Sequence, residues 1–229
     1  TFTFDSSGLT TDTDTIAITA AAVTTSASLT TGLGADTLTG SAGNDSLRGN
    51  NAADVYIGGD GADTSTLTET VSASDIVRIS GVAGTSSESN SVTNTGNDNN
   101  TGEDTIVGLT FGTDVIQIVT TGQLAYVHGT DSGIGTADAG AAATGIAGDY
   151  LATVGLLDLD NDGLYNGVDD VVVNVTGASA TMTETNFEAS IVYDVDLAAA
   201  GVAFTGGSLA DTITGGAGTD SITGGGGID

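Results

Sequence analysis

An aspartate stands at every ninth position in one stretch of this chain, and the same spacing returns near the C-terminus. From residue 31 the chain reads TGLGADTLT, GSAGNDSLR, GNNAADVYI and GGDGADTST, and from residue 206 it reads GGSLADTIT, GGAGTDSIT and GGGGID. The sixth position is aspartate in every block, and the eighth, where present, is apolar except at Ser65. A glycine-rich linker would need neither a shared phase nor an apolar eighth position. The period therefore predicts a repetitive fold in which each block is one structural unit.

The residue types in each block suit a tight turn followed by a short strand. Glycine adopts positive φ angles without penalty, so the turn can aim several carbonyl oxygens at one point. The aspartate adds a charged oxygen beside them, and Ca²⁺ takes about six to eight oxygen ligands. The last three residues form a strand whose middle side chain points inward. One block makes half a coil, so aspartates two blocks apart should stack with ions between their turns: Asp36 on Asp54, Asp45 on Asp63, and Asp211 on Asp229.

The composition of the chain also indicates a need for cations. It has 30 acidic residues, two basic ones and a formal net charge of −28. This balance excludes a basic nucleic-acid-binding groove and attraction to an anionic membrane, because there are almost no cations to meet phosphate. Neutralising the charge would take about 14 divalent ions, and hard oxygen ligands favour Ca²⁺ or Mg²⁺. Cysteine is absent, so ions would take the place of disulfides. No apolar run approaches the roughly 18 residues of a membrane span.

The blocks match the nonapeptide GGxGxDxUx, and the chain resembles the RTX (repeats-in-toxin) family of calcium-binding proteins that Gram-negative bacteria export by type I secretion. The resemblance implies a parallel β-roll, several bound Ca²⁺ ions and an extracellular or cell-surface location. In that family the ligands are the sixth-position carboxylate and the carbonyl oxygens at positions two and four. Carried onto this chain, the resemblance implies a ligand set of Gly32, Gly34, Asp36, Gly43, Asp45, Asp54, Gly59, Gly61, Asp63, Gly207, Asp211, Gly216, Gly218, Asp220, Gly225, Gly227 and Asp229. The family pattern is broken where Asn50, Asn51, Ala52 and Leu209 replace turn residues, which puts ions at those two turns in doubt.

The middle of the chain, residues 67–200, is predicted to be rich in strands, with two long insertions at Gly81–Gly102 and Gly129–Gly148, the second a loop or a poor helix. Strands are expected at Asp75–Ser80, Asp104–Leu109, Asp114–Thr120, Tyr150–Leu157, Val171–Val175 and Ile191–Val195. The segments Glu103–Ile118 and Leu157–Gly177 resemble the region that follows the β-roll in serralysin-type proteases and RTX lipases. We therefore expect an all-β fold in which parallel β-roll segments are interrupted by a β-sandwich-like module. The expected units are 1–66, with N-terminal strands and a first roll; 67–200, the middle module; and 201–229, a second roll that is cut off or continues.

A second kind of calcium site is predicted in the loop between Leu157 and Val171. Its carboxylates alternate ahead of a turn glycine, Gly163, with the spacing of an EF-hand loop. The flanking segments look like strands, so an EF-hand is not expected, and a solvated aspartate-rich hairpin tip is the alternative. The candidate ligands are Asp158, Asp160, Asp162, Asn166 and Asp169.

Catalytic motifs are missing from the sequence. HExxH and GxSxG do not occur, and His128, the one histidine, follows an apolar strand where a surface role fits better than catalysis. We therefore expect a protein that is not an enzyme: a secreted, calcium-dependent structural subunit of a surface layer, sheath or filament. The final block stops at Asp229, leaving an open coil edge onto which more of the chain or another molecule would stack, so self-association is the expected partnership. A cell-surface polysaccharide could be bound through regions outside this chain. The alternatives are an RTX adhesin or biofilm-matrix fragment, and the secretion and folding module of an RTX enzyme.

Overall fold

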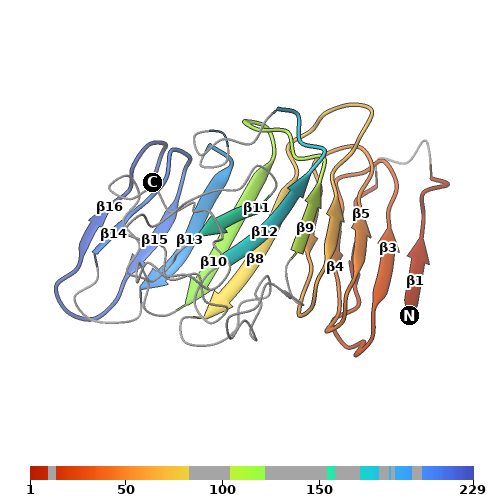
Figure 1. Ribbon diagram of the computed structural model, residues 1–229, viewed down its shortest axis with the longest axis horizontal. Helices are drawn as coiled ribbons and strands as arrows, with labels where there is room; N and C mark the ends of the chain where they lie inside the picture. Colours follow the sequence, from red (N-terminus) through yellow and green to blue (C-terminus); the bar gives the residue numbers. More distant parts are fainter. Residues whose placement is uncertain are drawn as a thin grey trace.

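The computed structural model describes residues 1–9, 14–82, 104–121, 154–157, 171–180, 186, 189–197 and 203–229. In these ranges the chain forms sixteen strands that follow one another along an elongated stack, with the N-terminus near one end and β16 near the other (Figure 1). Within them no helix is long and apolar enough to cross a membrane. The strands are β1 (Phe2–Asp5), β2 (Ala17–Thr19), β3 (Ala27–Thr30), β4 (Thr37–Thr39), β5 (Ser46–Arg48), β6 (Val55–Ile57), β7 (Thr64–Thr66), β8 (Ile76–Val82), β9 (Asp104–Val107), β10 (Val115–Thr121), β11 (Val154–Leu157), β12 (Val171–Thr176), β13 (Ile191–Leu197), β14 (Ala203–Thr205), β15 (Thr212–Gly215) and β16 (Ser221–Thr223).

Successive strands of the first array alternate between two sheets. One sheet has the order β1-β3-β5-β7-β9-β12-β11, the other the order β15-β13-β10-β8-β6-β4-β2, and β14 pairs with β16 in a small third sheet. Thr37 of β4 lies opposite Val55 of β6, and Ser46 of β5 opposite Thr64 of β7, and both pairs of strands are parallel. The register shift is 18 residues in each pair (55 less 37 and 64 less 46). Two blocks therefore make one coil, as the period predicted.

The core is built from the middle residue of each short strand. Leu38, Leu47 and Tyr56, which hold the eighth position of their blocks, have no exposed surface. They face inward because alternate side chains of a strand point to opposite faces of its sheet. Ser65, where the apolar pattern lapses, is compensated from the other sheet: the Tyr56 hydroxyl donates to the carbonyl of the neighbouring Thr66 at 3.2 Å. The Tyr56 side chain thus reaches from β6 across the core to β7, the strand that carries Ser65.

The middle of the chain joins the same two sheets. Strands are found in all six of the predicted segments, as β8 to β13. β8 pairs in parallel with β6, and β9 with β7, so the described middle strands add coils to the roll instead of forming separate sheets. The all-β class and the parallel β-roll are confirmed, but among the described residues the roll runs on through the middle where an interruption was expected.

The physical reason for this continuity is that inserted residues only have to return the chain to the next rung of each sheet. β12 pairs in parallel with β9, whereas β11 pairs with β12 in the antiparallel direction and forms the edge of that sheet. The unit boundaries at residues 66 and 200 stay predictions.

Candidate calcium sites

The aspartates of the first array form two ladders, each at the N-terminal end of the strands of one sheet. Asp36, Asp45, Asp54 and Asp63 are all buried, although each carries a carboxylate. The backbone N–H of Asp36 donates to Oδ1 of Asp54 at 2.8 Å, and the N–H of Asp45 donates to Oδ1 of Asp63 at 2.7 Å. The predicted stacking of aspartates two blocks apart is therefore confirmed. One oxygen of the later aspartate in each pair, Oδ1 of Asp54 or Asp63, accepts the hydrogen bond that links its coil to the coil before it.

The second carboxylate oxygen points into the turn of its own block. In the described part of the chain, Oδ2 of Asp36 and Oδ2 of Asp54 are buried and have no hydrogen-bond partner. Oδ2 of Asp54 lies so close to the first-position glycine that a Cβ on Gly49 would be 1.9 Å from it. A buried, unpaired anionic oxygen is costly unless a cation meets it. An all-oxygen set of carboxylates and turn carbonyls is what Ca²⁺ prefers, so these residues fit a calcium ion, which would neutralise the carboxylates and link neighbouring turns.

The turn conformation survives where the glycines do not. Gly59 and Gly61, at positions two and four of their block, have φ angles of 97° and 119°. Asn50 and Ala52 hold the same positions one block earlier and have φ angles of 70° and 82°, in the left-handed region that non-glycine residues seldom adopt. The side-chain amide of Asn50 donates to the carbonyl of Thr31 in the neighbouring coil, which helps to hold this conformation. The turn that the sequence put in doubt therefore has the backbone that the repeat requires.

The C-terminal array has the same hydrogen bonding with fewer coils around it. Oδ1 of Asp211 accepts from the N–H of Tyr193 at 2.8 Å, and Oδ1 of Asp229 accepts from the N–H of Asp211 at 3.1 Å. Asp211 is buried, whereas Asp220 is half-buried and Asp229 is exposed. The ten glycines predicted to offer carbonyl oxygens all lie in turns next to the strands of the two arrays, the last two of them after β16: Gly32, Gly34, Gly43, Gly59, Gly61, Gly207, Gly216, Gly218, Gly225 and Gly227. Their role as ligands stays a prediction.

The ladders continue through aspartates that the nine-residue period does not reach. Oδ1 of Asp75 accepts from the N–H of Asp54 at 2.9 Å, 21 residues away in sequence. Oδ1 of Asp104 accepts from the N–H of Asp63 at 2.9 Å across 41 residues, and Oδ1 of Asp114 accepts from the N–H of Asp75 at 3.2 Å across 39.

These three ladder positions were expected only as the starts of strands. The signal that marks them is local: an aspartate two residues ahead of a buried apolar residue, as in Asp75-Ile76-Val77 and Asp114-Val115-Ile116. The same pattern, without the period, would have found them.

The electrostatics of the ladder oppose ionisation when no cation is bound. Burial raises the pKa of Asp54 to about 7. The hydrogen bond from the Asp36 backbone lowers this pKa, whereas the charges of Asp36 and Glu69 raise it further. Burial likewise raises the pKa of Asp75 to about 8, with the charges of Asp54, Glu69 and Asp114 in support. Burial also raises the pKa of Asp114. A divalent cation bound beside these carboxyls would lower their pKa, so each would lose its proton more readily.

Backbone oxygens are needed to complete any ion site in the described ranges. Within these ranges no group of three or more histidine, cysteine, aspartate or glutamate side chains is placed to hold a metal. This agrees with a repeat in which each turn supplies one carboxylate and its carbonyl oxygens supply the rest. The predicted loop site with Asp158, Asp160, Asp162, Asn166 and Asp169 lies outside the described residues, as does His128.

Comparison with known proteins agrees with this geometry. The model of the RTX calcium-binding nonapeptide repeat matches the chain in four copies, over residues 30–64 and 204–229. The fold is thus a parallel β-roll that carries RTX repeats, and the repeats are motifs known to bind calcium. Proteins with such repeats are generally secreted, which supports an extracellular location. A search of curated proteins found no match.

Proposed function

We propose that this chain is part of an extracellular structural protein, a subunit of a surface layer, sheath or filament, that calcium folds and assembles. The observation that carries the proposal is the length of the two aspartate ladders. They run from the first array into the middle of the chain, through Asp75 and Asp114 in one sheet and Asp104 in the other. The same hydrogen bond, from a backbone N–H to an aspartate Oδ1 of the next coil, thus links the described coils along two seven-stranded sheets. Such repeated links suit a load-bearing rod.

Calcium would act as the switch that turns this chain from an unfolded polyanion into a rod. Without the ion, stacked buried carboxylates repel one another and hold protons near neutral pH. With the ion, the free energy of binding becomes free energy of folding, because the site does not exist in the unfolded chain. Low calcium inside the cell and high calcium outside would then restrict folding to the exterior.

The proposal is tested by assembly of the purified chain. Millimolar Ca²⁺ should restore the β signal in circular dichroism, raise light scattering and yield ordered sheets or filaments in negative-stain microscopy, and EDTA should dissolve them. Mg²⁺ at the same concentration is the control, because it holds to a smaller, octahedral shell and keeps its waters. A calcium-loaded chain that stays monomeric at every concentration would count against the structural role and leave the adhesin or the enzyme accessory module. A spectrum unchanged by chelation would count against the calcium staples themselves.

A further inference from the structure

The turn between β7 and β8, residues 67–75, differs from the other turns of the first array. It reads LTETVSASD, contains no glycine, and separates Asp63 from Asp75 by 12 residues where nine separate the aspartates before it. It also lies beyond residue 64, where the first match to the nonapeptide repeat ends. The added length brings a second carboxylate, that of Glu69, into the turn.

Both carboxylates of this turn have one oxygen engaged and one oxygen buried without a partner. The backbone N–H of Ala73 donates to Oε1 of Glu69 at 2.5 Å, and the N–H of Asp54 donates to Oδ1 of Asp75 at 2.9 Å. Oε2 of Glu69 and Oδ2 of Asp75 are buried, and among the described residues neither has a hydrogen-bond partner. Asp75 itself has no exposed surface. The hydrogen bonds therefore fix both side chains, while Oε2 of Glu69 and Oδ2 of Asp75 stay outside any hydrogen bond of standard geometry among the described residues.

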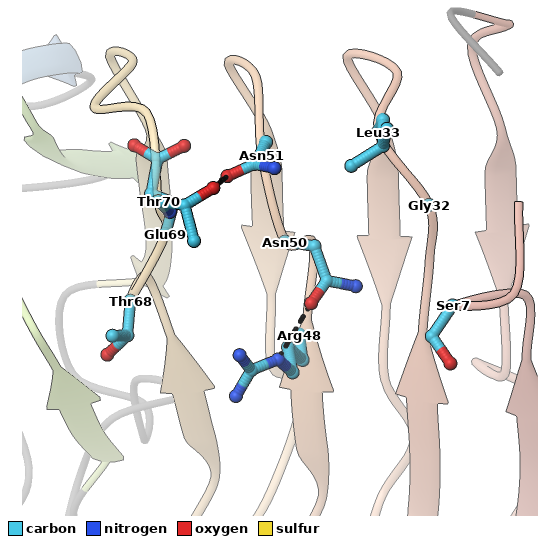
Figure 2. A pocket seen from close by; sticks show the side chains of 9 residues that line it. All are labelled: Ser7, Gly32, Leu33, Arg48, Asn50, Asn51, Thr68, Glu69 and Thr70. Carbon is cyan, nitrogen blue, oxygen red and sulfur yellow. Dashed lines mark hydrogen bonds between the residues drawn. The ribbon is translucent and has the colours of Figure 1, made fainter. Parts of the chain in front are cut away.

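The charge of Glu69 acts on Asp75 and opposes the ionisation of that carboxyl. The charge of Glu69 contributes to the raised pKa of Asp75, after burial and the charge of Asp54. Burial raises the pKa of Glu69 as well. Figure 2 shows the Glu69 carboxylate directed toward the tip of its turn and away from the guanidinium of Arg48, which bonds to Oδ1 of Asn50 instead at 2.9 Å. Arg48 and Glu69 line the same surface pocket, yet the Arg48 guanidinium does not neutralise the Glu69 carboxylate.

We infer that the turn 67–75 binds a calcium ion of its own through Oε2 of Glu69 and Oδ2 of Asp75, outside the nonapeptide repeats. A hard cation is the ligand that two buried, unpaired carboxylate oxygens lack, and backbone oxygens or water must complete its shell, because no ready-made cluster of three acidic side chains exists in the described residues. In this turn a glutamate side chain would supply the oxygen that glycine-rich turns draw from their backbone. The inference rests on the proposed calcium loading of the roll.

The test is the number of Ca²⁺ ions bound by the whole chain, measured by equilibrium dialysis and calorimetry, for Glu69→Gln, Asp75→Asn and the double variant. Each substitution keeps the oxygen that accepts the fixing hydrogen bond and removes the charge. We expect each single variant to lose the same one ion, or to bind it at least tenfold more weakly, and the double variant to lose no further ion. Asp60→Asn is the matched control, since Asp60 is an exposed turn residue of the fourth block and its substitution removes the same charge.

Thermal unfolding separates an ion ligand from a residue that only shapes the turn. In EDTA the midpoints of Glu69→Gln and Asp75→Asn should be no lower than that of the unchanged chain, because each substitution keeps the fixing hydrogen bond, and the increase caused by Ca²⁺ should shrink. Variants that keep the full ion count, or that lower the midpoint equally with and without Ca²⁺, would overturn the site. An unchanged chain that binds no calcium would overturn the proposed function and this site together, whereas a loaded chain indifferent to both substitutions overturns this site alone.

Discussion

Replacing Gly49 with alanine should push a ladder carboxylate, that of Asp54, out of its position. A Cβ on Gly49 would lie 1.9 Å from Oδ2, 2.3 Å from Cγ and 2.7 Å from Cβ of Asp54, so its three nearest contacts all belong to that aspartate. Contacts of a Cβ below 3.0 Å are essentially never seen, so Oδ2 has to retreat by about 1.1 Å (3.0 less 1.9 Å). Calcium–oxygen distances span only about 0.3 Å, so this displacement takes the oxygen out of bonding range.

The expected loss has two parts that can be measured separately. An ion present at a hundred times its Kd stabilises the folded chain by about 2.7 kcal/mol, and the calcium-dependent part of the free energy of unfolding should fall by about this amount. Overpacking at the turn adds about 1–3 kcal/mol of destabilisation with or without calcium.

Urea unfolding of the unchanged chain and of Gly49→Ala, in Ca²⁺ and in EDTA, gives both parts. Gly8→Ala is the control, since a Cβ there would meet nothing within 4 Å. If Gly49→Ala keeps the whole calcium-dependent increment of Gly8→Ala, Oδ2 of Asp54 is not a ligand and the reasoning is refuted.

Three further predictions concern the ladder, the turn and the core. In EDTA the free energy of unfolding should fall as the pH rises from about 4 to about 8, because aspartates in the unfolded chain lose their protons near pH 3.8, whereas Asp54 and Asp75 in the folded chain keep theirs until about pH 7 and 8. Calcium affinity should rise over the same pH range, because the ion competes with these protons. Titration calorimetry at about pH 5 and about pH 8 checks the sign of the change in affinity. Ala52→Gly should stabilise the chain by about 1 kcal/mol in urea unfolding, because alanine is strained at a φ of 82°, whereas Ala53→Gly next to it should bring no gain. Leu38→Ala should cost about 2–5 kcal/mol, because Leu38 is fully buried, yet it should leave the calcium count unchanged; a lost ion would show that core and ladder are not separable.

Much of the first array could be predicted from its residues because its interactions repeat at one sequence offset. The phase of Asp36, Asp45, Asp54 and Asp63 predicted the stacking and the inward strand residue, and the register of the strands confirms both. The doubt about the turn at Asn50 and Ala52 rested on local preference, and there the packing of coils on both sides outweighs the cost of a left-handed backbone.

The sequence by itself determined the unit of this protein: nine residues, half a coil, one buried apolar side chain and one aspartate that faces its equivalent 18 residues away. Only the tertiary structure decided how far the ladders extend, because Asp75, Asp104 and Asp114 reach their rungs after 21, 41 and 39 residues. The physical reason is that hydrogen bonding between parallel strands depends on where the chain returns and not on how many residues it spends in between. The entropy of closing a loop grows only with the logarithm of its length. A long insertion therefore erases the period from the sequence while leaving the ladder of carboxylates intact in space.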